Sequence, residues 1–161
     1  MPILYYFFTW VLVTFLQVVV APRLSIMGIY PDILTAFIVI IALKQGRITA
    51  LWMAFALALS IDLLDPAKLG WMTLILSIIG YFMGVIRDTL YFENPWFEAT
   101  MILLATFIFQ LAYRFFPAPQ FFAVNSMKMI SEAAFISIYT VAVAGLIIWV
   151  IRQGFQVREM L

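Results

Sequence analysis

The chain has 161 residues, of which 66% are hydrophobic and 11% are charged, and its formal net charge is +1. A soluble domain has roughly a quarter of its residues charged, so most of this protein's outside must face lipid, and nothing in its balance of charge indicates nucleic acid binding. The sequence contains no cysteine and no histidine, which excludes disulfides, thiol chemistry, the usual zinc sites and histidine-dependent catalysis.

Six apolar stretches predict a single integral-membrane domain over residues 1–161, an all-α polytopic bundle of six transmembrane helices. They are residues 3–21, 31–44, 47–62, 69–86, 96–113 and 132–151. About 20 apolar residues are needed to cross a bilayer core of roughly 30 Å. The first stretch lacks the basic start of a signal peptide and is too long for a signal core, so we interpret it as a retained anchor.

The stretches 31–44 and 47–62 are shorter than a comfortable span, and only Gln45 and Gly46 separate them. We predict two short helices in a hairpin, because Pro31 suits a first helical position and both Lys44 and Arg47 can reach one interface. Alternatively, residues 31–44 dip into the membrane and return. That alternative leaves five crossings and puts the termini on opposite sides.

The basic residues set the predicted orientation. With six crossings, one side receives Lys44, Arg47, Arg87, Arg152 and Arg158, and the other receives Arg23, Lys68, Arg114 and Lys128. The positive-inside rule then makes the first side cytoplasmic, with both termini on it. The longest predicted connection, residues 114–128, is rich in phenylalanine and proline, and we interpret it as an interfacial loop or as a partner surface.

Small residues four positions apart allow helices to approach closely in lipid, and the chain has two such series. Ala50, Ala54 and Ala58 share a helix face with Asp62, and Gly80 and Gly84 form a GxxxG pair whose side Ser77 and Thr73 extend. Both series fit a packing seam between the third and fourth predicted helices, or a surface for another membrane protein. A weaker series, Ala133, Ser137, Thr140 and Ala144, fits either interpretation.

Asp62 is the most informative polar residue, because an acid near the membrane boundary must be solvated, paired or hydrogen-bonded. It could anchor the loop by bonding free amides before the next helix, with Lys68 as an ion partner; it could contact a partner protein; or it could bind a cation or proton in transport. Asp65 precedes Pro66 and therefore belongs to a turn.

The other polar residues point away from catalysis. Glu98 and Glu132 occupy predicted first turns, where the helix dipole favours an acid, and Gln17 and Gln110 could form interhelical hydrogen bonds. No nucleophile is accompanied by a base and an orienting group. We expect no catalytic residue, no metal and no cofactor.

The stretch from Pro31 to Gly84 resembles the rod-shape-determining protein MreD family. The resemblance rests on "PDILTAF" at 31–37, on the helix-ending Asp62, on "LG" at 69–70 and on "LSIIGYFMG" at 76–84. Family members often have glycines before the aspartate and a Gly/Ser-rich turn after it, whereas this chain has "ALWMAFALALSID" followed by "LLDPAKLG". Alanine preserves close packing but lacks the freedom of glycine, which puts a shared role for this loop in doubt.

The resemblance implies a non-enzymatic component of the bacterial cell-elongation complex, in the inner membrane. Its expected partners are MreC, a single-pass periplasmic scaffold, together with MreB, RodA and a penicillin-binding transpeptidase. The family is also similar in fold to the substrate-binding components of energy-coupling-factor transporters. An alternative function is therefore a solute-binding component of a membrane transporter.

Overall fold

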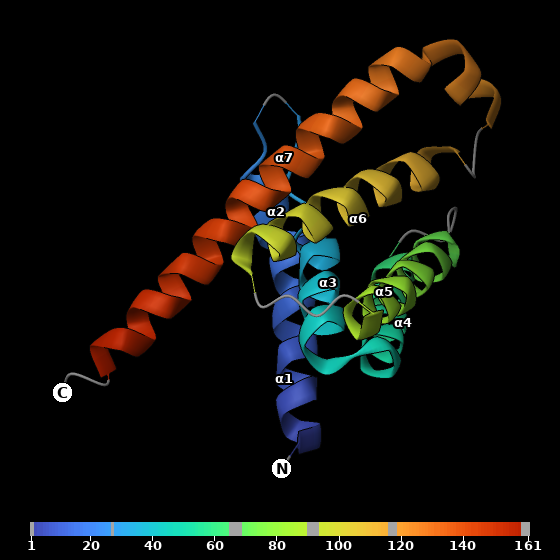
Figure 1. Cartoon of the computed structure of the whole chain (residues 1–161). Helices are drawn as coiled ribbons and strands as arrows, with labels where there is room; N and C mark the ends of the chain where they lie inside the picture. The colour runs from blue at the N-terminus through green and yellow to red at the C-terminus, as the bar shows by residue number, and fades with distance from the viewer. Residues whose placement is uncertain (1, 27, 65–68, 90–93, 116–118, 159–161) are drawn as a thin grey trace.

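The computed structural model describes residues 2–26, 28–64, 69–89, 94–115 and 119–158, and these residues are almost entirely helical. The first rod is α1 (Pro2–Phe15), which continues through a π-helical turn, η1 (Leu16–Val20), into α2 (Ala21–Arg23). The remaining helices are α3 (Ile33–Gln45), α4 (Arg47–Asp62), α5 (Trp71–Thr89), α6 (Pro95–Phe115) and α7 (Pro119–Arg158). The described chain is thus a helical membrane bundle (Figure 1).

Four stretches of the described residues are long and apolar enough to cross a membrane: Tyr6–Arg23, Trp71–Thr89, Pro95–Phe115 and Ser126–Ile148. Helices α3 and α4 have 13 and 16 residues, so at 1.5 Å per residue they extend about 20 and 24 Å. Both fall short of a core of roughly 30 Å. Whether they cross completely, as six spans require, stays a prediction.

Three local predictions are wrong. Pro31 is not at a first helical position, because α3 begins at Ile33 and Asp32 is its N-cap. The predicted loop at 114–128 is helical from Pro119 onward, since a proline at the first position of a helix costs no hydrogen bond and pre-sets its dihedral angle. Glu132, expected in a first turn, therefore lies well inside α7.

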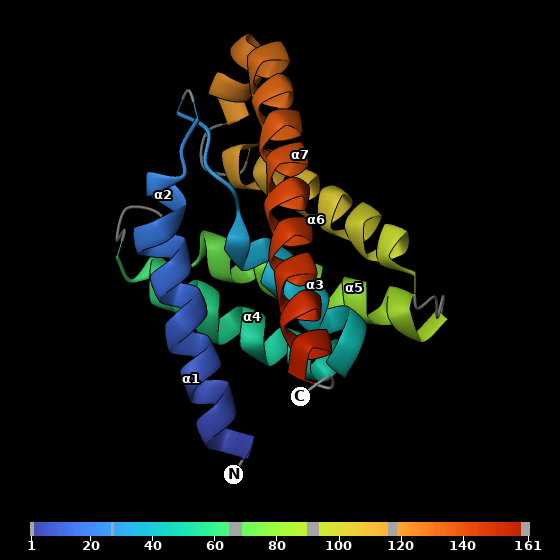
Figure 2. The same cartoon turned by 90° about the vertical axis from the view of Figure 1, so that its left-hand side faces the viewer.

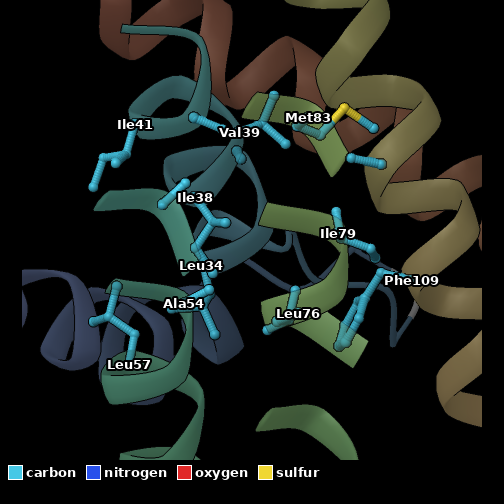
Figure 3. Close-up of a cluster of buried hydrophobic side chains, with 14 of the residues drawn as sticks. Leu34, Ile38, Val39, Ile41, Ala54, Leu57, Leu76, Ile79, Met83 and Phe109 are labelled. Atoms are coloured by element: carbon cyan, nitrogen blue, oxygen red, sulfur yellow. The ribbon is translucent and has the colours of Figure 1, made fainter. Parts of the chain in front are cut away.

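Helix α3 is the centre of the bundle, and it contacts α1, α4, α5, α6 and α7. Its sequence is apolar on every side, which is the pattern of a helix buried all round. Leu34, Ile38 and Val39 are fully buried, and Figure 3 shows them among side chains from α4, α5 and α6. The core of the protein therefore surrounds α3.

The ends of the chain lie on the same side of the bundle. The start of α1, the turn between α3 and α4, and the end of α7 all lie at the bottom of Figures 1 and 2. The turn depends on Gly46, whose φ of 94° lies in the left-handed region that favours glycine. Helix α7 has 40 residues. Its first turns bend away from the rest, which runs diagonally across the bundle (Figure 1).

Candidate functional site: a capped helix start and a membrane groove

The small residues of α4 and α5 lie inside the protein. Ala50, Ala54 and Ala58 have no exposed surface, and Gly80 and Gly84 are buried as well. A Cβ atom on Gly80 would lie 3.1 Å from Ile38 Cγ2 and 3.2 Å from the carbonyl oxygen of Ala50.

Gly84 lies closer still to α4, because a Cβ atom there would be 2.5 Å from the backbone nitrogen of Arg47. Ser77, half-buried on the same helix, donates its hydroxyl to the carbonyl oxygen of Thr73 at 2.6 Å. This close contact of α4 with α5, here called the α4–α5 seam, leaves the glycines no surface to offer another molecule.

Asp62 lies at the end of the α4–α5 seam and caps the next helix. Its Oδ2 accepts hydrogen bonds from the backbone N–H of Gly70 at 3.1 Å, the N–H of Thr73 at 2.8 Å and the hydroxyl of Thr73 at 2.6 Å. The first N–H groups of a helix have no acceptor within the helix, so the last residue of α4 supplies one to α5. Lys68, its suggested ion partner, lies outside the described residues, as do Asp65 and Pro66.

A second buried aspartate, Asp32, has the same role, and sequence reasoning missed it. Its Oδ1 accepts the N–H of Thr35 at 3.0 Å, and its Oδ2 accepts the hydroxyl of Thr35 at 2.7 Å. Aspartate is among the best N-cap residues, so an aspartate just before an apolar run was the available signal.

Side chains from three other segments meet at this start of α3. Thr140 of α7 accepts the N–H of Asp32 at 2.9 Å, Gln17 of η1 accepts the N–H of Leu34 at 3.0 Å, and Gln110 of α6 donates to Asp32 Oδ2 at 3.4 Å. Both glutamines therefore make interhelical hydrogen bonds. We call this set, with Thr35, the capping network. It joins the start of α3 to η1, α6 and α7.

The π-helical turn and a buried stripe on α7 supply two members of the capping network. Gln17 lies within η1, and such a turn rotates the side chains beyond it relative to a regular helix. Ala133, Ser137, Thr140 and Ala144 are all buried, so the third small-residue series faces the interior of the bundle.

Below the capping network, the lower halves of α1 and α7 diverge (Figure 1) and leave a groove with α3 as its floor. Its volume is about 210 Å³. The lining is almost wholly apolar and includes Leu12 of α1, Leu16 of η1, Ala36 and Phe37 of α3, and Val143 and Ile147 of α7. We call it the α1–α7 groove. The groove can accept an apolar molecule or an apolar segment of another protein from within the membrane. Its lining offers no set of reactive groups.

The described residues contain no group of three acidic, cysteine or histidine side chains that could hold a metal ion. The fold and these sites define a multi-pass helical membrane protein in which buried carboxylates cap helices. The family model for rod shape-determining protein MreD matches residues 1–156, and the chain therefore belongs to the MreD family, a family of shape-determining membrane proteins. No curated protein and no solved structure matches the chain.

Proposed function

We propose that this protein is a non-enzymatic component of the bacterial cell-elongation complex, located in the inner membrane with both termini in the cytoplasm, and that it binds MreC. Membership of the MreD family and the multi-pass helical bundle support the proposal. MreB, RodA and a penicillin-binding transpeptidase are proposed as further members of the same complex. The protein would then help to organise peptidoglycan synthesis by binding these partners, and it would catalyse no reaction itself.

The α1–α7 groove is the proposed docking site for the transmembrane helix of MreC, and it is the observation that carries the proposal. In lipid, helix association depends on close packing, which small residues at an interface permit. Ala36 and Ala144 lie in this groove, with Thr140 at its upper end. The part of α3 that forms the floor extends from Ile33 to Ile40, about 10 Å, so two turns of a partner helix could lie against it.

The α4–α5 seam has a different proposed role. Gly80 and Gly84 of α5 face α4, and the three alanines of α4 face α5. We therefore propose that these residues hold α4 and α5 together and that Asp62 anchors the connection between the two helices. Contact between these residues and a partner would require α4 and α5 to separate. The α1–α7 groove is open without any such change.

The alternative, a solute-binding transport component, fits these features less well. A pocket for a polar solute needs several convergent hydrogen-bonding groups. The α1–α7 groove is lined by almost none, and both carboxylate oxygens of Asp32 already accept bonds from the chain itself. A water-soluble small molecule, other than a lipid, that remains with the purified protein at one copy per chain would favour the alternative.

Blocking the groove tests the docking proposal. Val143→Trp would fill the groove, whereas Leu146→Trp adds the same side chain at a position that is 63% exposed on the same helix. Val143→Trp should weaken co-purification with MreC by at least about tenfold, equivalent to about 1.4 kcal/mol, and Leu146→Trp should not. Equal retention of MreC by both folded variants would refute docking in the groove.

The proposed orientation can be tested separately because the chain has no cysteine of its own. A cysteine introduced by Gln45→Cys, at the end of α3 beside the turn at the bottom of Figure 1, should react with an impermeant maleimide only from the cytoplasmic side. One introduced by Ser25→Cys, in the loop at the other end, should react only from outside. Labelling of both from one side would contradict six crossings.

A further inference from the structure

A second cavity lies at the other end of the bundle from the termini, between the segment that follows α2, the last turns of α6 and the part of α7 around Glu132 and Ile136. Its volume is about 210 Å³. Tyr30, Gln110, Arg114 and Glu132 line it together with Gly28 and Ile136. In contrast to the α1–α7 groove, its lining is largely polar. It shares Gln110 with the capping network, and the docking proposal does not use it. We call it the headgroup cavity, for the ligand inferred below.

The wall of the headgroup cavity is held in place by hydrogen bonds. Ile26 and Ile29 exchange backbone hydrogen bonds of 2.8 and 3.0 Å around Gly28, whose φ is 81°. Tyr139 of α7 donates its hydroxyl to the carbonyl oxygen of Leu24 at 2.8 Å, and Thr140 accepts the N–H of Asp32. Both ends of this segment are therefore fastened to α7.

The cavity contains one charge of each sign. Arg114 Nη1 lies 2.9 Å from Glu132 Oε2, and the two side chains are 23% and 38% exposed. Nη1 also donates to the carbonyl oxygen of Met129 at 3.4 Å. A guanidinium has five N–H donors in a planar fork that suits phosphate, and the bonds found among the described residues use only its Nη1 end.

The level of Arg114 in the membrane limits the source of a ligand. Helix α6 has 21 residues and so extends about 31 Å, which matches a hydrocarbon core of roughly 30 Å. Arg114 lies in its last turn, where the helix dipole favours a cation. A membrane-spanning α6 would place this guanidinium at the level of the phospholipid headgroups.

We propose that the headgroup cavity binds the zwitterionic headgroup of a phospholipid that carries a primary ammonium, such as phosphatidylethanolamine. The phosphate faces the fork of Arg114, and the ammonium faces Glu132 and donates to its carboxylate. A cavity of about 210 Å³ is smaller than the roughly 300 Å³ at which pockets enclose drug-sized ligands, so it suits a headgroup of a few heavy atoms. The acyl chains leave over Ile136 into the bilayer.

The presence of both charges distinguishes this headgroup from others. An anionic headgroup with no cation, such as that of phosphatidylglycerol, would leave Glu132 facing a phosphate of the same sign. Phosphatidylcholine has the charges but its quaternary ammonium has no N–H to donate to the carboxylate. The expected order of binding is phosphatidylethanolamine, then phosphatidylcholine, then phosphatidylglycerol.

Native mass spectrometry of the delipidated full-length protein in detergent, titrated with each dioleoyl lipid, tests this order. Wild-type protein should bind one phosphatidylethanolamine at least about tenfold more tightly than phosphatidylglycerol, because a charge-assisted hydrogen bond is lost with the latter. Glu132→Gln should abolish the preference. Glu98→Gln, an acid-to-amide change in the first turn of the same helix as Arg114, should leave it intact.

Arg114→Lys is a second variant for the case that Glu132→Gln does not fold, and it should weaken phosphatidylethanolamine binding because an ammonium has no fork. The proposal is overturned if wild-type protein shows no preference, if the preference survives in a folded Glu132→Gln variant, or if a folded Arg114→Lys variant binds phosphatidylethanolamine as tightly as wild type does. Soluble phosphoethanolamine that protects the protein from unfolding as well as the lipid does would overturn a lipid as the source. None of these results bears on the binding of MreC.

Discussion

The strongest test of the α4–α5 seam is the substitution Gly84→Ala. An ideal Cβ atom at Gly84 would lie 2.5 Å from the nitrogen and 2.6 Å from the Cβ of Arg47, and closer still to its Cα. Carbon atoms in contact are about 3.5 to 4.0 Å apart, so the start of α4 would have to move by about 1 Å. The atoms in the way belong to the backbone and its first side-chain carbon, which cannot rotate aside.

The cost follows from comparison with the other helical glycines. Overpacking a tight interface typically costs about 1 to 3 kcal/mol, and we expect Gly84→Ala to lower the free energy of unfolding by about 3 kcal/mol. At Gly80 the new Cβ atom meets Ile38 Cγ2 at 3.1 Å and the carbonyl oxygen of Ala50 at 3.2 Å, so the side chain and the backbone need to yield by only a few tenths of an ångström, and we expect a loss of about 1 kcal/mol, the low end of that range. At Gly145 no atom lies within 4 Å, and the better helix propensity of alanine predicts a gain of up to about 1 kcal/mol.

The three alanine variants form a matched series for reversible unfolding by SDS in mixed micelles, with helix content followed by circular dichroism. The predicted order of stability is Gly145→Ala, then Gly80→Ala, then Gly84→Ala. If Gly84→Ala were as stable as Gly145→Ala, the α4 backbone would not lie against this glycine, and the seam described here would be wrong.

Three further predictions concern polar contacts, with the free energy of unfolding as the measurement. Asp62→Ala removes the acceptor of three hydrogen bonds and should cost about 2 to 3 kcal/mol, whereas Thr73→Val removes one hydroxyl donor and should cost about 1 kcal/mol; equal losses would argue against Asp62 as a cap. Asp32→Ala should cost about 3 kcal/mol and speed hydrogen exchange in the first turn of α3 but not of α5; unchanged exchange there would contradict the capping network. Trp10→Phe removes a donor that bonds α1 to α4 through the hydroxyl of Ser60 at 3.1 Å, and should cost about 1 kcal/mol; no loss would mean that apolar packing alone holds α1.

The class of protein follows from composition, because a chain with 11% charged residues cannot cover a soluble surface. The positions of the helices are also local properties of the sequence, set by apolar runs and by breakers such as Gly46. The stretch predicted at 47–62 has the same bounds as α4, Arg47–Asp62. Where local signals competed, as with Pro31 beside Asp32, the cap decided the start of the helix and the proline did not.

Which faces meet could be decided only by the tertiary structure. The GxxxG pair and the alanine series fit an internal seam and an external surface equally well, because periodicity states that one face is special but not what lies against it. The capping network joins Asp32 to Gln110 and Thr140, which are 78 and 108 residues away along the chain. The α1–α7 groove and the headgroup cavity likewise arise between segments distant in sequence, so their chemistry depends on how the helices cross, which no single stretch of residues encodes.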